Sequence, residues 1–150
     1  IVKKELCELR TKTELTMIVG KGLYNILSNS VGVTNLVGTN IFPEIAPPDI
    51  NPPYIVYSVI SNTPTEVKEN GNQLDTASVE IYSFETSYEK AVDLGVMVRT
   101  ALDRRRSPGT AGFGGVQINS IEYTNEQMDV NEKRDIWVSI QDYSVRIINT

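Results

Sequence analysis

Helix-like spacing of apolar positions occurs first in the stretch MIVGKGLYNILSNS, at residues 17–30. Its apolar side chains recur at the interval that places them on one helix face. These positions are Val19, Leu23, Ile26 and Leu27. We expect VTNLVG, at residues 33–38, to follow as a further short turn or helix that Gly38 ends.

A second helical pattern begins after residue 85 and has a defined start and end. Thr86, with Glu89 three residues later, matches a capping box, in which each side chain accepts a hydrogen bond from the other residue's backbone amide. The pattern ends at Arg104–Arg106, where cations suit the negative end of the helix dipole. An apolar stripe runs along one face: Tyr88, Ala91, Gly95, Val98 and Leu102, widened by Leu94 and Ala101.

Strand-like patterns fill most of the remaining chain. The segments are residues 40–45, 54–61, 77–84, 116–124 and 136–148. The run YIVYSVIS, at 54–61, has apolar residues on both faces, so we expect the core to cover one face and a helix or another subunit to cover the other. Four prolines precede this run: Pro47, Pro48, Pro52 and Pro53. Proline lacks an amide donor, so we expect a stiff approach with the strand beginning after it.

The order of these elements is helix, strand, strand, strand, helix, strand, strand. It predicts an α+β fold, with a mixed, mostly antiparallel sheet and helices packed mainly on one face. The 150 residues are enough for a single domain with its own core. Residues 1–16 are charged and carry Leu6, Leu9 and Leu15, so we expect an N-terminal extension or arm that orders against a neighbour, followed by the domain at 17–150.

Composition narrows the class of protein. The formal net charge of −5 argues against a general nucleic-acid binder, which would carry a basic stripe. The single cysteine, Cys7, excludes an internal disulfide and favours a reducing compartment. No stretch approaches the roughly 20 apolar residues that span a bilayer, and residues 1–16 lack the apolar core of a secretory signal. We expect a soluble product of the cytoplasm that does not enter a membrane.

Residues that carry chemistry are sparse. The sequence contains no histidine, which removes the commonest general base and metal ligand. Gly20-Lys21 has Leu15 where a phosphate-binding loop requires glycine, and the glycine cluster at 112–115 follows a helix, so we interpret them as helix surface and flexible loop. Cys7 has no histidine to activate it. We therefore expect no catalytic residue, no cofactor and no metal.

Charged clusters remain as candidates. Arg104, Arg105 and Arg106 form the one basic cluster, and they serve either to cap the helix or to pair bidentately with an acidic loop of a neighbouring subunit. The acidic side of such a contact is expected on the last hairpin, at Glu126, Asp129 and Glu132. An ion pair with Arg99 or Arg146 is expected for Asp142 in the last strand.

Two polar connections between strands, at 62–75 and 125–135, are expected to face partners, because binding residues concentrate on loops. The first contains Asn70-Gly71, a strong turn signal. Its candidate partner-facing residues are Glu66, Lys68, Glu69, Asn70 and Asp75.

Several segments follow one another in an informative order. They are Met17-Ile18 followed by LYNIL, then NLVGTNIFPEIAP, PPYIVYSVIS, VEIYSFETSYEKAVDLGVMVRTALD, GGVQINSIEYTNEQ and RDIWVSIQDYSVRI. This succession, from Met17 to about Ile148, resembles the tail completion, or tail terminator, family of long-tailed bacteriophages and prophages. The resemblance rests on the succession and not on any single motif. Residues 1–16 lie upstream of where such sequences usually begin.

The resemblance implies a structural role in the tail and neck of a virion. Such proteins form a ring, commonly six-fold, on the head-proximal end of the tail tube. The ring stops polymerisation of the tube protein and offers a docking surface to the head-side connector or stopper, and DNA passes through its centre. A net negative charge agrees with this, because cationic contacts are what hold phosphates.

Two other hypotheses stay open. The first is another neck component, such as a head-completion protein or connector adaptor, which differs in the neighbour that each face meets. The second, from a different class, is a small metal-dependent hydrolase that uses the acidic loops. The second predicts that a divalent metal raises the melting temperature and that Glu126→Ala or Asp129→Ala abolishes the effect.

Overall fold

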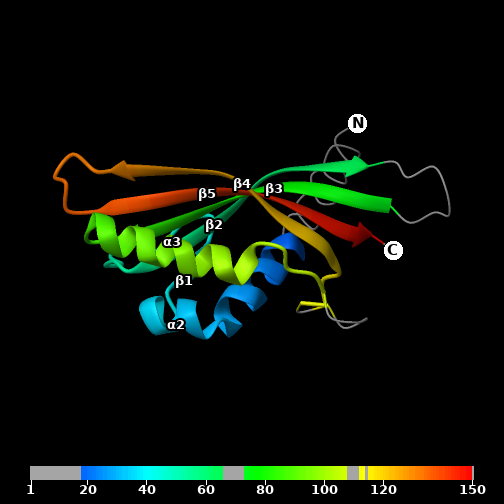
Figure 1. Ribbon diagram of the computed structural model, residues 1–150, viewed down its shortest axis with the longest axis horizontal. Helices are drawn as coiled ribbons and strands as arrows, with labels where there is room; N and C mark the ends of the chain where they lie inside the picture. Colours follow the sequence, from blue (N-terminus) through cyan, green and yellow to red (C-terminus); the bar gives the residue numbers. More distant parts are fainter. Residues whose placement is uncertain (1–17, 66–72, 108–111, 114, 150) are drawn as a thin grey trace, which may run out of the picture.

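The computed structural model describes residues 18–65, 73–107, 112–113 and 115–149. Within them the chain forms two layers, a five-stranded sheet and a set of helices that cover one of its faces (Figure 1). The N-terminal arm expected at 1–16 and the turn expected at Asn70-Gly71 lie outside the described residues.

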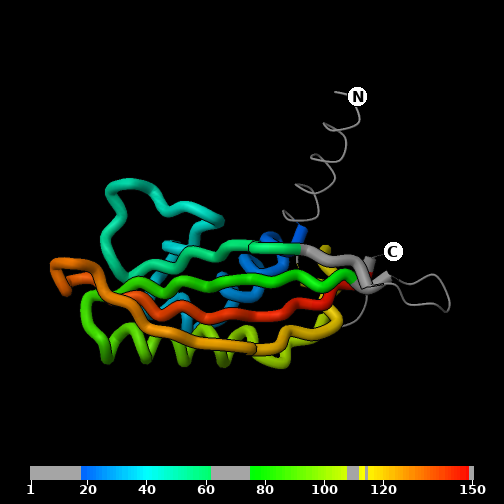
Figure 2. Tube along the Cα trace, turned by 90° about the horizontal axis from the view of Figure 1, so that it is seen from above, coloured from blue at the N-terminus to red at the C-terminus, as the bar shows by residue number. Residues whose placement is uncertain are grey.

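The sheet is mixed and mostly antiparallel, as predicted. Its strands are β1 (Ile41–Pro43), β2 (Tyr54–Thr65), β3 (Gln73–Glu85), β4 (Ile118–Val130) and β5 (Trp137–Asn149). They lie in the order β1-β2-β3-β5-β4. The short edge strand β1 runs parallel to β2, and every other pair is antiparallel. Figure 2 looks onto the face that the helices leave uncovered, which we call the open face.

The helical layer agrees with the apolar periodicity. Residues 18–29 are helical, and α2 (Val31–Val37) and α3 (Tyr88–Leu102) follow along the chain. Gly38 ends α2 as predicted, with a φ of 61° that favours glycine. The predicted α+β fold class and the order of elements are confirmed.

The core lies between the two layers. Alternate residues of the central strands point towards the helices and are buried, among them Val79 and Ile81 of β3 and Val145 of β5. They belong to one hydrophobic cluster with Leu23 of the first helix and Leu94 of α3. Because every layer contributes to this cluster, removal of its apolar surface from water holds the sheet and helices together as one domain.

The start of α3 differs from the prediction by one residue. The N-cap is Ser87, whose Oγ accepts a hydrogen bond from the backbone N of Lys90 at 3.3 Å. Lys90 therefore occupies the position that Glu89 would hold in a capping box, and the predicted pair of Thr86 and Glu89 does not form. The backbone N of Thr86 instead donates to the carboxylate of Glu85.

The strands are longer than their apolar patterns. β4 continues to Val130 and β3 begins at Gln73, because backbone pairing with β5 holds these polar segments extended. As a result Asp75 lies inside β3, opposite Ile147 of β5, and is only 4% exposed. Its assignment to a partner-facing loop was wrong.

The proline-rich approach to β2 agrees with the prediction, since the strand begins at Tyr54 directly after Pro53. β1 protects only the first part of the outer edge of β2. Beyond it, the carboxylate of Glu44 accepts hydrogen bonds from the backbone N of Val59 at 3.2 Å and from Ser58 Oγ at 2.8 Å. A side chain therefore takes the place of the missing edge strand at this point.

Candidate interaction surfaces

The basic cluster, which we call the arginine segment (Arg104–Arg106), directly follows α3. Arg105 Nε donates to the carbonyl oxygen of Ala101 at 2.8 Å and so caps the last turn of the helix. The backbone N of Arg104 donates to the carbonyl oxygen of Ile121 in β4, which fixes the segment beside that strand. All three side chains are exposed, and no described residue accepts a hydrogen bond from the guanidinium of Arg104 or Arg106.

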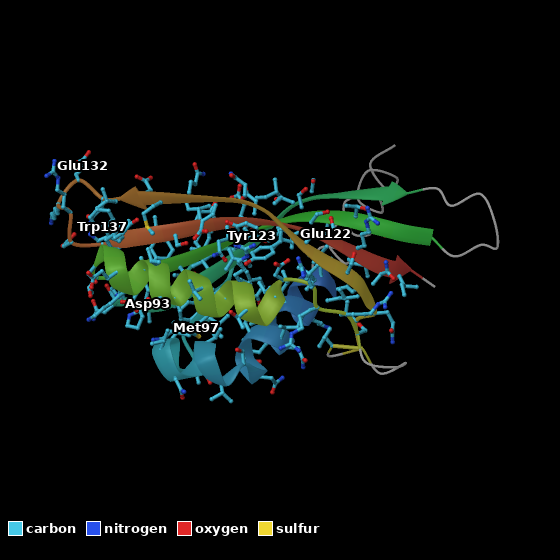
Figure 3. All side chains as sticks on the ribbon, in the orientation of Figure 1. Asp93, Met97, Glu122, Tyr123, Glu132 and Trp137 are labelled. Atoms are coloured by element: carbon cyan, nitrogen blue, oxygen red, sulfur yellow. The ribbon has the colours of Figure 1, made fainter. Side chains whose placement is uncertain are left out.

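The acidic hairpin, residues 125–135, joins β4 to β5. Asn131 organises its turn, because Oδ1 accepts from the backbone N atoms of Asp135 and Ile136 at 3.1 and 3.2 Å. Glu132 is exposed at the tip (Figure 3). Asp129 is exposed near the end of β4, and one of its oxygens accepts from the backbone N of Val130. Glu132 and Asp129 thus point out of the subunit.

Glu126, the third acidic candidate, faces the helices. Its Oε1 accepts hydrogen bonds from Ser139 Oγ at 3.2 Å and Gln141 Nε2 at 3.4 Å, and its Oε2 accepts from Tyr123 Oη at 2.8 Å. Three donors of its own chain therefore engage the carboxylate, which limits its value as a partner for an external arginine.

The arginine segment and the hairpin tip lie at different places along β4. Arg104 is fixed at Ile121, whereas Glu132 lies beyond Val130 at the end of the strand (Figure 3). At about 3.3 Å per residue, the two points of attachment are roughly 30 Å apart. The two charged groups therefore cannot meet within one subunit.

A buried polar network beneath α3 was not predicted from the sequence. Gln141 Nε2 donates to the carbonyl oxygen of Gly95 at 2.9 Å, and Tyr143 Oη donates to Gln141 Oε1 at 2.6 Å. Burial raises the pKa of Tyr143 above its usual value. The signal in the sequence was Gly95, within the apolar stripe of α3, because an added Cβ there would lie 2.9 Å from Ser139 Oγ.

The open face carries an aromatic strip, Phe42, Tyr54, Tyr82 and Phe84. The rings of Tyr54 and Phe84 stack with centroids 4.5 Å apart, and Phe42 and Tyr82 each have a ring neighbour in the strip at 6.4 Å. These residues alternate with buried ones along their strands, so they face away from the helices. Within the described chain no helix covers the other face of β2, although Val56 on that face is buried, and a partner for this face stays a prediction.

Beside this strip two carboxylates stand directly opposite each other, Glu80 of β3 and Asp142 of β5. Tyr82 Oη donates a hydrogen bond to Glu80, and this bond is the main cause that raises the pKa of Tyr82 to about 12. Asp142 Oδ2 accepts from Asn125 Nδ2 at 3.4 Å, whereas Oδ1 is buried without a hydrogen-bond partner in the described structure.

The prediction that Asp142 pairs with Arg99 was wrong, because Arg99 lies on the other side of the sheet and pairs with Asp103 instead. Arg99 Nε lies 3.6 Å from Asp103 Oδ2, and its guanidinium stacks 3.8 Å from the ring centroid of Tyr123. No ion pair joins Asp142 to Arg146 either in the part of the chain described. The acidic pair on the open face thus lacks a cation of its own.

The outer side of the helical layer also exposes apolar side chains. Val31 and Leu36 of α2 are 70% and 40% exposed, and Val96 and Met97 of α3 are 52% and 37% exposed. The two helices meet here, because a Cβ added to Gly32 would lie 2.9 Å from Met97 Sδ (Figure 3). The subunit thus has an uncovered apolar surface on each side.

Within the described residues, no group of three potential ligands lies close enough together to hold a metal ion. A hollow of about 410 Å³ lies beside Pro52 and Pro53, and its lining also includes Glu85, Thr86, Lys90 and Asp93. No helix among these residues has the length and apolar character needed to cross a bilayer. The residues Glu66, Lys68, Glu69 and Asn70, expected to face a partner, lie outside the described structure.

Comparison with known proteins identifies the family. The family model described as tail completion protein gp17 matches residues 21–148. The comparison with curated proteins gave no match. A chain from the solved structure "Virion of native gene transfer agent (GTA) particle" shares the fold, with a TM-score of 0.66 and 14% identity over 85% of this chain and 92% of that chain. The chain therefore belongs to the tail completion protein family.

Proposed function

We propose that this protein is a structural subunit of a virion that forms a ring, of six copies, on the head-proximal end of the tail tube. The ring ends polymerisation of the tube protein and joins the tail to the head-side connector or stopper. The family match over residues 21–148 carries this proposal. The likeness of the fold to a chain of a gene transfer agent virion supports it.

The distribution of charge supports a ring built by contacts between unlike surfaces. The free guanidinium groups of Arg104 and Arg106 lie roughly 30 Å along β4 from Glu132 at the tip of the acidic hairpin, so these groups pair with Glu132 only between subunits. A contact between two different surfaces repeats from subunit to subunit and closes a ring when the rotation permits. Arg105 is partly committed to capping α3, so Arg104 and Arg106 are the main basic partners.

The remaining parts of the proposal follow from the ring. The subunit is made in the host cytoplasm and assembles into the neck of the virion without a cofactor and without an enzymatic step. DNA passes through the lumen without specific binding, and the net charge of −5 agrees with weak attraction to phosphates.

Assembly with purified tail tubes tests the role. Mass photometry of the protein alone and mixed with tubes, followed by negative-stain imaging, should show rings or caps on one end of each tube. Protein that ignores tubes but binds portal–connector complexes would identify a connector-side adaptor instead. Protein that binds neither assembly would contradict both structural roles.

A charge exchange tests the contact. Arg106→Glu should weaken ring formation, and added salt should weaken the wild-type ring in the same direction. The matched control is Lys21→Glu, which makes the same change of charge at an exposed site on the first helix. Glu132→Arg combined with Arg106→Glu should restore assembly. Equal loss of assembly in Lys21→Glu, or no restoration in the combined variant, would refute the specific pairing.

A further inference from the structure

The aromatic strip continues as an apolar surface across the open face. By register, Val138 of β5 lies opposite Phe84 and Ile140 lies opposite Tyr82. Tyr54 and Phe42 extend the surface across β2 to β1. Contiguous apolar patches of this kind are uncommon on surfaces that stay in water and mark sites of association.

The helical side presents the second uncovered apolar surface. Val96 and Met97 of α3 and Val31 and Leu36 of α2 form it, at the place where the two helices meet. It lies on the side of the subunit away from the open face, because the helices cover the other face of the sheet (Figure 1). One chain therefore carries two apolar surfaces that point in opposite directions.

We propose that these two surfaces bind each other between neighbouring copies, so that the α2–α3 surface of one subunit packs on the open face of the next. Every subunit then covers one neighbour and is covered by the other. This inference rests on the proposed ring, and it specifies which faces of the subunit form the ring contact.

The charges of the open face favour contact with the helical side of a second copy over contact with a second open face. The face carries the carboxylates of Glu80, Glu122, Asp129 and Asp142 and the guanidinium of Arg146. Two open faces packed on each other would bring like charges together in a desolvated contact, which is unfavourable. The helical side carries the exposed carboxylates of Glu89 and Asp93 towards the start of α3, but it also brings the free cations of the arginine segment at the end of that helix.

The contact also includes the charge pairing proposed above. Asp129 belongs both to the acidic hairpin and to the open face, since it lies opposite Val138. An α3 helix that lies over the open face carries the arginine segment of the same subunit with it. Glu80 and Asp142, which lack a cation of their own in the described structure, then lie in the same contact.

Cysteine cross-linking tests this contact directly. In a Cys7→Ser background, Val96→Cys marks the helical side and Gln127→Cys marks the open face, where Gln127 lies opposite Ile140. Both sites are exposed, so neither change disturbs the core. Complexes assembled on tail tubes are treated with a short bis-maleimide and separated by denaturing electrophoresis.

A variant that carries both cysteines should give a ladder of cross-linked species, a mixture of the two single variants should give dimers alone, and each single variant should give none. Caps on tube ends without these cross-links would overturn the inference and leave the proposed function standing. Cross-links within one single variant would show pairing of like faces and also overturn it. Absence of any assembly with tubes would refute the proposed function together with this inference.

Discussion

Gly95 sets how closely α3 approaches the sheet. It lies in the apolar stripe of the helix, and its carbonyl oxygen accepts a hydrogen bond from Gln141 Nε2. A Cβ added at this position would lie 2.9 Å from Ser139 Oγ and 3.2 Å from Gln141 Nε2. Both partners are buried in β5, so Gly95→Ala forces either the network or the helix to move.

Two opposing contributions determine the magnitude. Alanine in a helix interior is favoured over glycine by about 1 kcal/mol. Overpacking a core typically costs about 1–3 kcal/mol, and leaving a buried donor such as Gln141 Nε2 with an acceptor fewer costs about 1–3 kcal/mol. We expect the free energy of unfolding of Gly95→Ala to fall by about 1–5 kcal/mol, with a loss of about 2–4 °C in melting temperature per kcal/mol for a chain of this length.

Urea unfolding and thermal melts of the isolated protein measure the change. The matched control is Gly20→Ala in the first helix, where the added Cβ would lie at an ordinary 3.4 Å from Tyr57 Cε2. Its stability should stay unchanged or rise by up to about 1 kcal/mol. Ser139→Ala in the Gly95→Ala background should recover part of the loss, because it removes the nearest atom. Stability of Gly95→Ala equal to or above wild type would refute this reasoning.

Three further predictions concern polar contacts. The hydrogen bond to Glu80 is the main cause that raises the pKa of Tyr82 from 10.0 to about 12, so the stability it contributes is complete below pH 10 and is lost as pH rises towards about 12. Glu80→Gln should lower the pH at which Tyr82 forms tyrosinate, as followed by absorbance. Tyr143→Phe removes the donor to the buried Gln141 Oε1 and should cost about 1–3 kcal/mol in urea unfolding, and an unchanged midpoint would exclude that bond as a stabilising contact. Glu44→Ala should speed hydrogen exchange of the β2 edge amide that its carboxylate protects, with little change in global stability.

The sequence predicted the fold where one physical signal dominated. Helical periodicity located residues 18–29 and α3, and the proline tract marked the start of β2 at Tyr54, because these patterns depend on local geometry. Strand ends were missed where a backbone ladder holds polar residues, as in β4 up to Val130. Asp75 was placed in a loop for the same reason. It lies in a polar segment, and the sequence of that segment does not show that its backbone pairs with β5 and that the side chain of Asp75 is buried.

The interaction surfaces were less accessible to sequence reasoning, because they depend on which face of the sheet each residue occupies. The bulge between Tyr123 and Asn125 shifts the alternation of β4, so that Glu126 points towards Gln141 while Asp129 points to the open face. Charge alone had grouped the two residues as equal partners of the arginine segment. With Glu126 engaged by its own chain, its replacement is expected to reduce stability before it affects assembly. Replacement of Glu132 is not expected to reduce stability in this way. The combined variant Arg106→Glu and Glu132→Arg therefore separates a defect of the interface from a defect of folding.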